Sequence, residues 1–145
     1  MKKSLRCICA ALFMLAFCTG FVIHASAVGG ESLYLTRYSA TVSASNNGAI
    51  EMSIFVVANK SVSELGASYI LLEESDDGGK TWSTAREYEG QSWMTAENRS
   101  TYSRTLSYPG TIGHQYRVTA EVFAKDANGG DSRTTPTSPV VTAKR

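Results

Sequence analysis

Period-two alternation of apolar and polar residues is the feature that most constrains the fold of this chain. In residues 50–58 the apolar positions are Ile50, Met52, Ile54, Val56 and Ala58. In residues 116–124 they are Tyr116, Val118, Ala120, Val122 and Ala124. Successive side chains of a β-strand point to opposite faces, so each segment predicts a strand with one buried face. No long stretch after residue 27 has the period of an amphipathic helix, and we expect an all-β protein.

Turn residues divide the chain into short segments. The expected strands are 38–44, 50–58, 65–74, 81–88, 101–108, 115–124 and 132–142. A polar loop is expected at 59–63, and 89–98 is the least regular segment. Pro136 and Pro139 cannot donate to a ladder, so the last strand should be an edge strand or an interrupted one. About seven short strands in one domain predict a single antiparallel β-sandwich.

The first residues predict a secretory signal peptide. Basic residues come first, at Lys2, Lys3 and Arg6, and an apolar run follows from Cys7 to Ile23. The A-x-A sequence at Ala25–Ala27 is typical of a cleavage site. We expect residues 1–27 to be removed and residues 28–145 to form one domain, regular over about 33–143. A retained membrane anchor is the alternative, although the apolar run is short for a span. The predicted localisation is extracellular, with no membrane contact after cleavage.

Composition after residue 27 excludes several kinds of site. All three cysteines, Cys7, Cys9 and Cys18, lie in the predicted signal, so the domain has no disulfide and no thiol ligand. Of the 14 basic residues three leave with the signal, which gives 11 against 13 acidic residues. A net charge near −2 without a basic cluster argues against a nucleic-acid partner. The core alone must hold the domain together.

The end of the chain resembles the second half of a fibronectin type III domain. Residues 108–111 read Tyr-Pro-Gly-Thr, residues 116–118 read Tyr-Arg-Val, and a Gly turn at 128–130 precedes a Ser-containing last strand. The resemblance implies a fibronectin- or immunoglobulin-like sandwich in which Tyr116 forms the tyrosine corner. Fibronectin modules usually carry a core tryptophan in the second strand, where this chain has Met52 and Ile54. A signal peptide followed by one such domain is also similar to small secreted proteins of Firmicutes.

Residues 75–82 resemble the Asp-box of sialidases and other β-propeller proteins. The matching positions are Ser75, Asp77, Gly79, Thr81 and Trp82. A propeller repeats such a signature in each blade, and here it occurs once. Turn chemistry accounts for each residue: Asp77 caps the turn, Gly79 takes a positive φ, and Trp82 packs inward. We therefore expect a structural hairpin turn and no catalytic role.

Catalytic and metal-binding residues are few. His114 is the only histidine after residue 27, and no G-x-S-x-G elbow accompanies it. The acidic run 73–77 could offer oxygen ligands to calcium, but alternation sends Glu73 and Glu74 to opposite faces. We expect a solvated strand end there. The sequence predicts no enzyme, no cofactor and no metal site.

Aromatic residues are the remaining candidates for ligand contact. Trp82, Trp93, Tyr88, Tyr69 and Tyr102 could form a sugar-stacking platform, or they could pack in the core and at strand edges. Trp93 lies in the irregular 89–98 segment, and we expect it to be exposed and, with Tyr88, to contact a ligand. The function predicted is an extracellular binding module with a protein or cell-surface partner. The alternatives are a carbohydrate-binding accessory domain and, less favoured, a sialidase-like enzyme.

Overall fold

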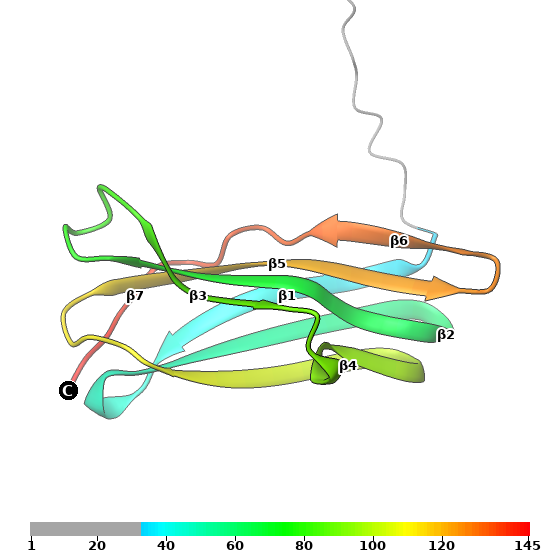
Figure 1. Ribbon diagram of the computed structural model, residues 1–145, viewed down its shortest axis with the longest axis horizontal. Coiled ribbons are helices and arrows are strands. Elements are labelled where there is room, and N and C mark those ends of the chain that lie inside the picture. The colour runs from blue at the N-terminus through cyan, green and yellow to red at the C-terminus, as the bar shows by residue number, and fades with distance from the viewer. Residues whose placement is uncertain (1–32) are drawn as a thin grey trace, which may run out of the picture. The chain divides into compact units, whose positions relative to one another are not determined.

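The computed structural model describes residues 33–145, and they are built almost entirely of β-strands (Figure 1). The strands are β1 (Leu35–Ala44), β2 (Ala49–Ser75), β3 (Ser83–Glu89), β4 (Thr95–Pro109), β5 (Gln115–Asp126), β6 (Gly129–Thr134) and β7 (Val141–Thr142). Two short 3-10 turns, η1 (Asn46–Gly48) and η2 (Ser92–Met94), lie between them. The all-β prediction is confirmed. The predicted signal peptide, residues 1–27, lies outside the described residues.

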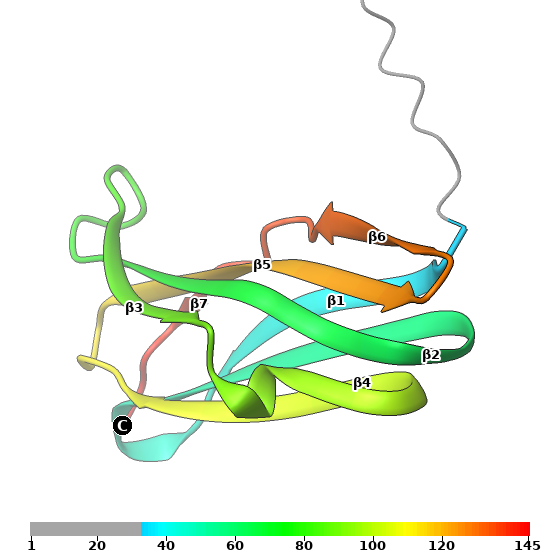
Figure 2. The same ribbon diagram turned by 45° about the vertical axis from the view of Figure 1, so that its right-hand side comes forward.

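The seven strands form one antiparallel sheet that curls because β2 turns back on itself. The first arm of β2, residues 49–58, pairs with β1 on one side and β4 on the other. The second arm, residues 64–75, pairs with β3 and β5. Figures 1 and 2 both show β2 reversing at one end of the molecule, so that the two arms lie over one another. Each arm therefore turns one face toward the other.

The core lies between the two arms and uses the positions that alternation predicts. Ile50, Met52, Ile54 and Val56 of the first arm are fully buried. In β5 the fully or almost fully buried side chains are Tyr116, Val118, Ala120, Val122 and Ala124. Burial of one aliphatic side chain contributes about 1.5–3 kcal/mol. Because residues 33–145 contain no cysteine, this apolar contact stabilises the domain without disulfides.

The structure differs from the predicted strands at the bend of β2. Residues 59–63 were expected to form a loop, but they belong to β2, and Val62 pairs with Arg99 of β4. Residues 95–98, expected to be irregular, begin β4 for the same reason. Asn98 takes a φ of 52°, which lets β4 follow β2 round the bend. Local sequence does not carry this signal, since the pairing joins residues far apart in the chain.

The last predicted strand is interrupted, as its two prolines require. β6 ends at Thr134 and β7 starts at Val141, with Pro136 and Pro139 between them. In this gap the hydroxyls of Thr135 and Ser138 accept hydrogen bonds from the backbone N–H groups of Ala120 (3.1 Å) and Val118 (2.9 Å). The backbone N–H groups of Thr135 and Ser138 donate in turn to the carbonyls of Ala120 (2.8 Å) and Val118 (2.9 Å), so the last segment stays bonded to β5 across the gap.

Gly66 gives a test of the close contact between β2 and η2. A Cβ at Gly66 would lie 1.9 Å from the carbonyl oxygen of Met94. We expect Gly66→Ala to lower the free energy of unfolding by more than about 2 kcal/mol in urea denaturation, because the backbone must move. Gly90→Ala is the matched control: Gly90 also has a positive φ, 63°, but faces open space, so only about 1 kcal/mol should be lost. Equal losses in the two variants would contradict this contact.

Candidate functional site

Tyr88 and Trp93, the predicted ligand-contact residues, pack against each other. Tyr88 is near the end of β3 and Trp93 is in η2. Their ring centroids are 5.5 Å apart with an interplanar angle of 74°, an edge-to-face arrangement. Trp93 was expected to be exposed, but both rings are half-buried against the core. The hydroxyl of Tyr102 donates to the Trp93 carbonyl at 3.2 Å, which ties η2 to β4 and holds the indole in place.

Two arginines flank this ring pair. The guanidinium carbon of Arg86 lies 5.4 Å from the centre of the Tyr88 ring, and that of Arg104 lies 5.1 Å from the centre of the Trp93 ring. Arg86 is paired with Leu72 and Arg104 with Ile54, both of them buried core residues. Cross-strand partners share a face, so both arginines leave their strands on the core-facing side. We call Arg86, Tyr88, Trp93 and Arg104 the edge cluster.

The charges of the edge cluster have no counter-charge in the described part of the chain. The ion pairs there involve Lys60, His114, Arg117 and Lys125, and neither Arg86 nor Arg104 makes an ion pair or a hydrogen bond. Burial raises the pKa of Tyr102, and the positive charge of Arg104 partly offsets that rise. A guanidinium stacked on a ring keeps the N–H donors around its rim available. The cluster can therefore present two guanidinium groups, each lying against an aromatic ring, to a ligand.

Sequence reasoning missed both arginines. The signal was present, since Arg104 lies between Tyr102 and Leu106 at an inward position of the alternating segment 101–108. A charge at such a position is unusual unless it has a partner or lies at an edge. β3 and β4 each pair only with β2 among the described strands, so they are edges. The open edge explains how these inward positions tolerate a charge.

The 75–82 turn is held by Asp77. One oxygen of its carboxylate accepts hydrogen bonds from the Ser75 hydroxyl (2.8 Å) and from the N–H groups of Lys80 and Thr81 (2.9 Å each). The other accepts from the Thr81 hydroxyl at 2.7 Å. These bonds, led by that of the Thr81 hydroxyl, lower the pKa of Asp77 from 3.8 to about 2. The Ser75 hydroxyl also accepts from the N–H of Gly79 (2.8 Å), whose φ is 87°.

Trp82 does not pack inward as the sequence suggested. Its ring lies under the guanidinium of Arg117, 4.2 Å from the centroid, and it is not part of the core cluster. Arg117 also binds both oxygens of Glu73, at 2.7 and 3.0 Å. Glu73 and Arg117 are partners on the outer face of the sheet, where they hold Trp82 on that side. Trp82 thus stacks on a cation whose charge is already neutralised.

Tyr116, the predicted tyrosine corner, is fully buried near the other end of the sheet. Its hydroxyl accepts a hydrogen bond from the Thr111 N–H at 2.8 Å and donates to the carboxylate of Glu74. The same carboxylate lies 2.8 Å from Nδ1 of His114. Burial raises the pKa of Glu74, but the hydrogen bonds from Tyr116 and His114 outweigh it, so the net shift is downward. Glu74 and His114 are therefore engaged in holding the turn that precedes β5.

Metal binding has no geometric support in residues 33–145. In that range no group of three or more His, Cys, Asp or Glu residues is placed to hold an ion. Within the acidic run, Glu73 pairs with Arg117, Glu74 with Tyr116 and His114, and Asp77 with its own turn. A cavity of about 110 Å³ borders Glu74 and His114, too small for more than a few atoms.

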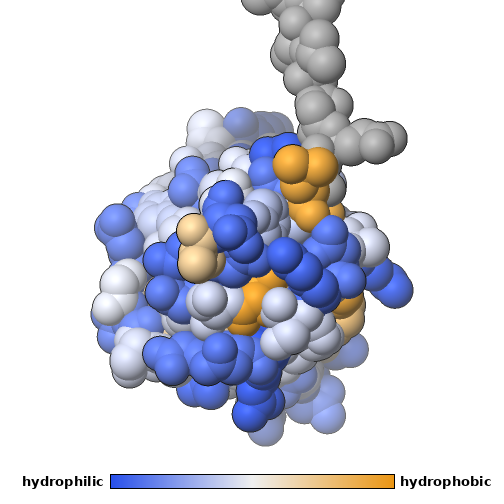
Figure 3. Space-filling model, turned by 90° about the vertical axis from the view of Figure 1, so that its right-hand side faces the viewer, coloured by the Kyte–Doolittle hydropathy of each residue, from blue (hydrophilic) through white to orange (hydrophobic). Residues whose placement is uncertain are grey.

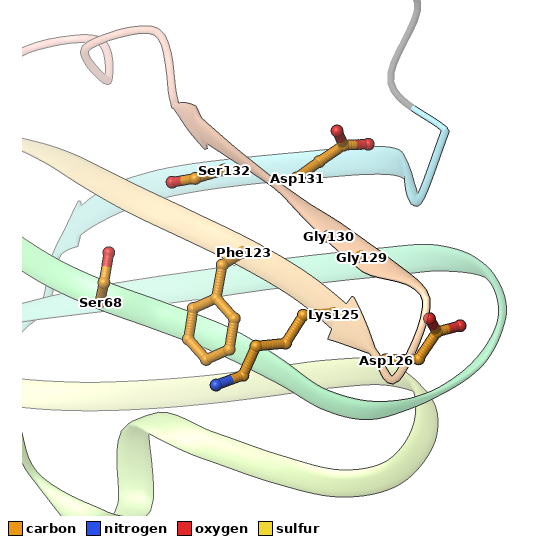
Figure 4. Close-up of a pocket in the computed structure, with 8 residues that line it drawn as sticks. All are labelled: Ser68, Phe123, Lys125, Asp126, Gly129, Gly130, Asp131 and Ser132. Carbon is orange, nitrogen blue, oxygen red and sulfur yellow. The ribbon is translucent and has the colours of Figure 1, made fainter.

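Two open depressions border the second arm of β2, one toward β5 and β6 and the other toward η2 and the start of β4. One, of about 640 Å³, is lined by β2, β5 and β6, and Figure 4 shows Phe123 and Lys125 projecting into it from the same side of β5. The other, of about 610 Å³, shares Ser68 and Phe123 with it. In the first depression Lys125 pairs with Glu64 at 3.1 Å and Asp126 with Lys60 at 2.8 Å. In the second, Glu89 and Glu97 make no ion pair among the described residues. The edge cluster is the better candidate site, because its two unpaired charges are arginines that lie against an aromatic ring pair.

Few large apolar side chains of the described residues are exposed. The exposed large apolar side chains are Leu33, Ile112 and Val140. The end of the molecule seen in Figure 3 is mostly hydrophilic, with small separate apolar areas. Within residues 33–145 no helix has the length and apolar character that a membrane span requires.

Comparison with known proteins assigns no family. No protein-family model matches the chain, and no curated protein matches it significantly.

Acid denaturation tests the role of Asp77. Its pKa is lowered on folding, so its hydrogen bonds stabilise the fold above pH 3.8 and lose this effect as the pH falls toward 2. We expect Asp77→Asn to lower the melting temperature near neutral pH. The melting temperature of this variant should also fall less steeply than that of the wild type as the pH is lowered from 3.8 to about 2. Asp76→Asn is the control, because Asp76 makes no hydrogen bond among the described residues. An unchanged melting temperature for Asp77→Asn would contradict the capping role.

Proposed function

We propose that this protein is a small secreted binding module without catalytic activity, and that the edge cluster is its contact surface. The observation that carries the proposal is the half-buried Tyr88–Trp93 pair, flanked by Arg86 and Arg104 at an open edge of the sheet. Tryptophan, tyrosine and arginine are the residue types that dominate binding energy at protein interfaces. A ring pair already fixed against the core loses little entropy on binding.

We also propose a fibronectin type III-like sandwich as the finer description of the curled sheet. In its support, β1 and β4 flank one arm of β2, and β3 and β5 flank the other, with the core between the arms. Two sheets that face each other across one core are the architecture of a sandwich. The bond from the Thr111 N–H to the Tyr116 hydroxyl ties a strand entry to upstream backbone, as a tyrosine corner does.

A protein partner fits the geometry better than a sugar. Stacking on a sugar needs a free aromatic face. Arg104 lies over one face of Trp93, Tyr88 meets it edge to face, and Arg117 lies over Trp82. Carbohydrate binding is therefore the second candidate function, and the glycan array described below tests it. Sialidase-like chemistry has less support, because Asp77 and Glu74 are both engaged in structural hydrogen bonds.

Secretion gives a direct test of the predicted signal peptide. We expect the exported protein to begin at Val28, because signal peptidase cleaves after small residues such as Ala25 and Ala27. Intact mass and amino-terminal sequencing of the exported protein would measure this. A chain that stays in the membrane fraction with residues 1–27 attached would contradict it and support the anchor.

Binding to the surface of the producing cells tests the contact surface. We expect labelled protein to bind saturably, and Trp93→Ala to weaken binding at least tenfold, as loss of a central aromatic commonly does. Trp82→Ala is the matched control, since it removes an arginine-stacked tryptophan elsewhere and should keep wild-type affinity. A glycan array run with the same variants would identify a sugar partner. Equal binding by Trp93→Ala and wild type, with both folded, would refute the proposal.

A further inference from the structure

We propose that the edge cluster binds an acidic segment of a protein partner, with a carboxylate group held by each of its two arginines. This inference rests on the proposed function and names the chemistry of the partner. The domain contains two arginine–tryptophan contacts that differ in charge. Arg117 over Trp82 is neutralised by Glu73, whereas Arg104 over Trp93 has no acid partner among the described residues.

Each ring of the pair has one such cation beside it. Arg86 lies 5.4 Å from the Tyr88 ring, Tyr88 lies 5.5 Å from Trp93, and Trp93 lies 5.1 Å from Arg104. Neither guanidinium makes an ion pair or a hydrogen bond among the described residues, so each can accept an anionic partner. Two positive charges beside one ring pair therefore favour an anionic ligand.

The form of the arginine side chain selects the anion. A guanidinium offers a planar fork of N–H donors that matches the two oxygens of a carboxylate. The guanidinium carbons of Arg86 and Arg104 lie 5.4 and 5.1 Å from the ring centres, and no described group accepts from their N–H donors, which are left for this fork. Because the rings also restrict the side chains, less conformational entropy is lost when the hydrogen bonds form. A ligand with two carboxylates can satisfy both arginines at once.

The open edges favour a polypeptide over an acidic glycan. β3 and β4 pair only with β2 in the described part of the chain, so each presents unpaired backbone groups. An extended peptide can lie along such an edge and place alternate side chains on one side, about 6.6–6.8 Å apart. A glycan has no backbone N–H and C=O ladder to offer, and guanidinium groups already lie over the rings on which a sugar would stack.

The inward position of the arginines also allows a purely protective role. Inward-facing charges on edge strands keep two copies of a protein from pairing edge to edge. That role would require Arg86 and Arg104 to prevent association, but it would not require them to bind a carboxylate. The experiment must separate the two roles.

A titration followed by nuclear magnetic resonance makes this separation. The isotope-labelled secreted protein is titrated with a decaglutamate peptide, with decaglutamine as the neutral control. We expect saturable shifts of the Nε–H signals of Arg86 and Arg104 and of the Trp93 indole N–H, with a Kd below about 1 mM. Arg117 and the Trp82 indole should not shift. Arg86→Gln and Arg104→Gln should each weaken binding at least tenfold, and added salt should weaken wild-type binding.

Three outcomes would overturn the proposal. The first is the absence of a saturable shift at the edge cluster. If the glutamine variants then self-associate while the wild type does not bind decaglutamate, the arginines have only the protective role. The second is an equal shift at Arg117, which would show unspecific attraction. The third is tighter binding of hyaluronan than of decaglutamate at the same carboxylate concentration. If Trp93→Ala abolishes cell binding but decaglutamate causes no shift in the wild type, the edge cluster is still the contact surface. Only the proposal of an acidic partner is then wrong.

Discussion

The packing of the two arms of β2 against each other is the interaction on which the rest of the structure depends. Both arms present alternate apolar side chains, and burying them together creates the one core of the domain. β1 and β4 attach to the first arm, and β3 and β5 attach to the second. The curl also brings the edges of β3 and β4 into one region, with η2 between them in the chain, and the edge cluster exists because of it.

The domain uses arginine–aromatic stacking in two different ways. At Trp82 the guanidinium of Arg117 is fixed between a ring and the Glu73 carboxylate, so ring, cation and acid complete one another. At Trp93 the third member of the set is missing in the described residues. The first arrangement is a finished structural unit, like the Asp77 turn beside it in the chain. The second has a ring and a guanidinium but no acid partner, and this difference is the reason for placing the proposed contact surface there.

Local patterns predicted the strands well wherever a strand had one buried face. The alternation in residues 50–58 and 116–124 gave the core positions correctly, and Pro136 and Pro139 explained the interrupted last strand. The expected loop at 59–63 was wrong, because pairing of Val62 with Arg99 extends both strands round the bend. The half-burial of Trp93 was also missed, since it depends on contacts with the core and with Tyr102.

The sequence by itself determined the all-β class, the core faces and the residues of the 75–82 turn, because these follow from side-chain period and from bonds within a few residues. Only the tertiary structure decided what those residues meet. Arg86 and Arg104 are 18 positions apart in the chain and reach one ring pair only because two edge strands come together. Trp82 faces outward because Glu73 and Arg117 are cross-strand partners. Partnership across a curled sheet is set by register and burial, which no local pattern encodes.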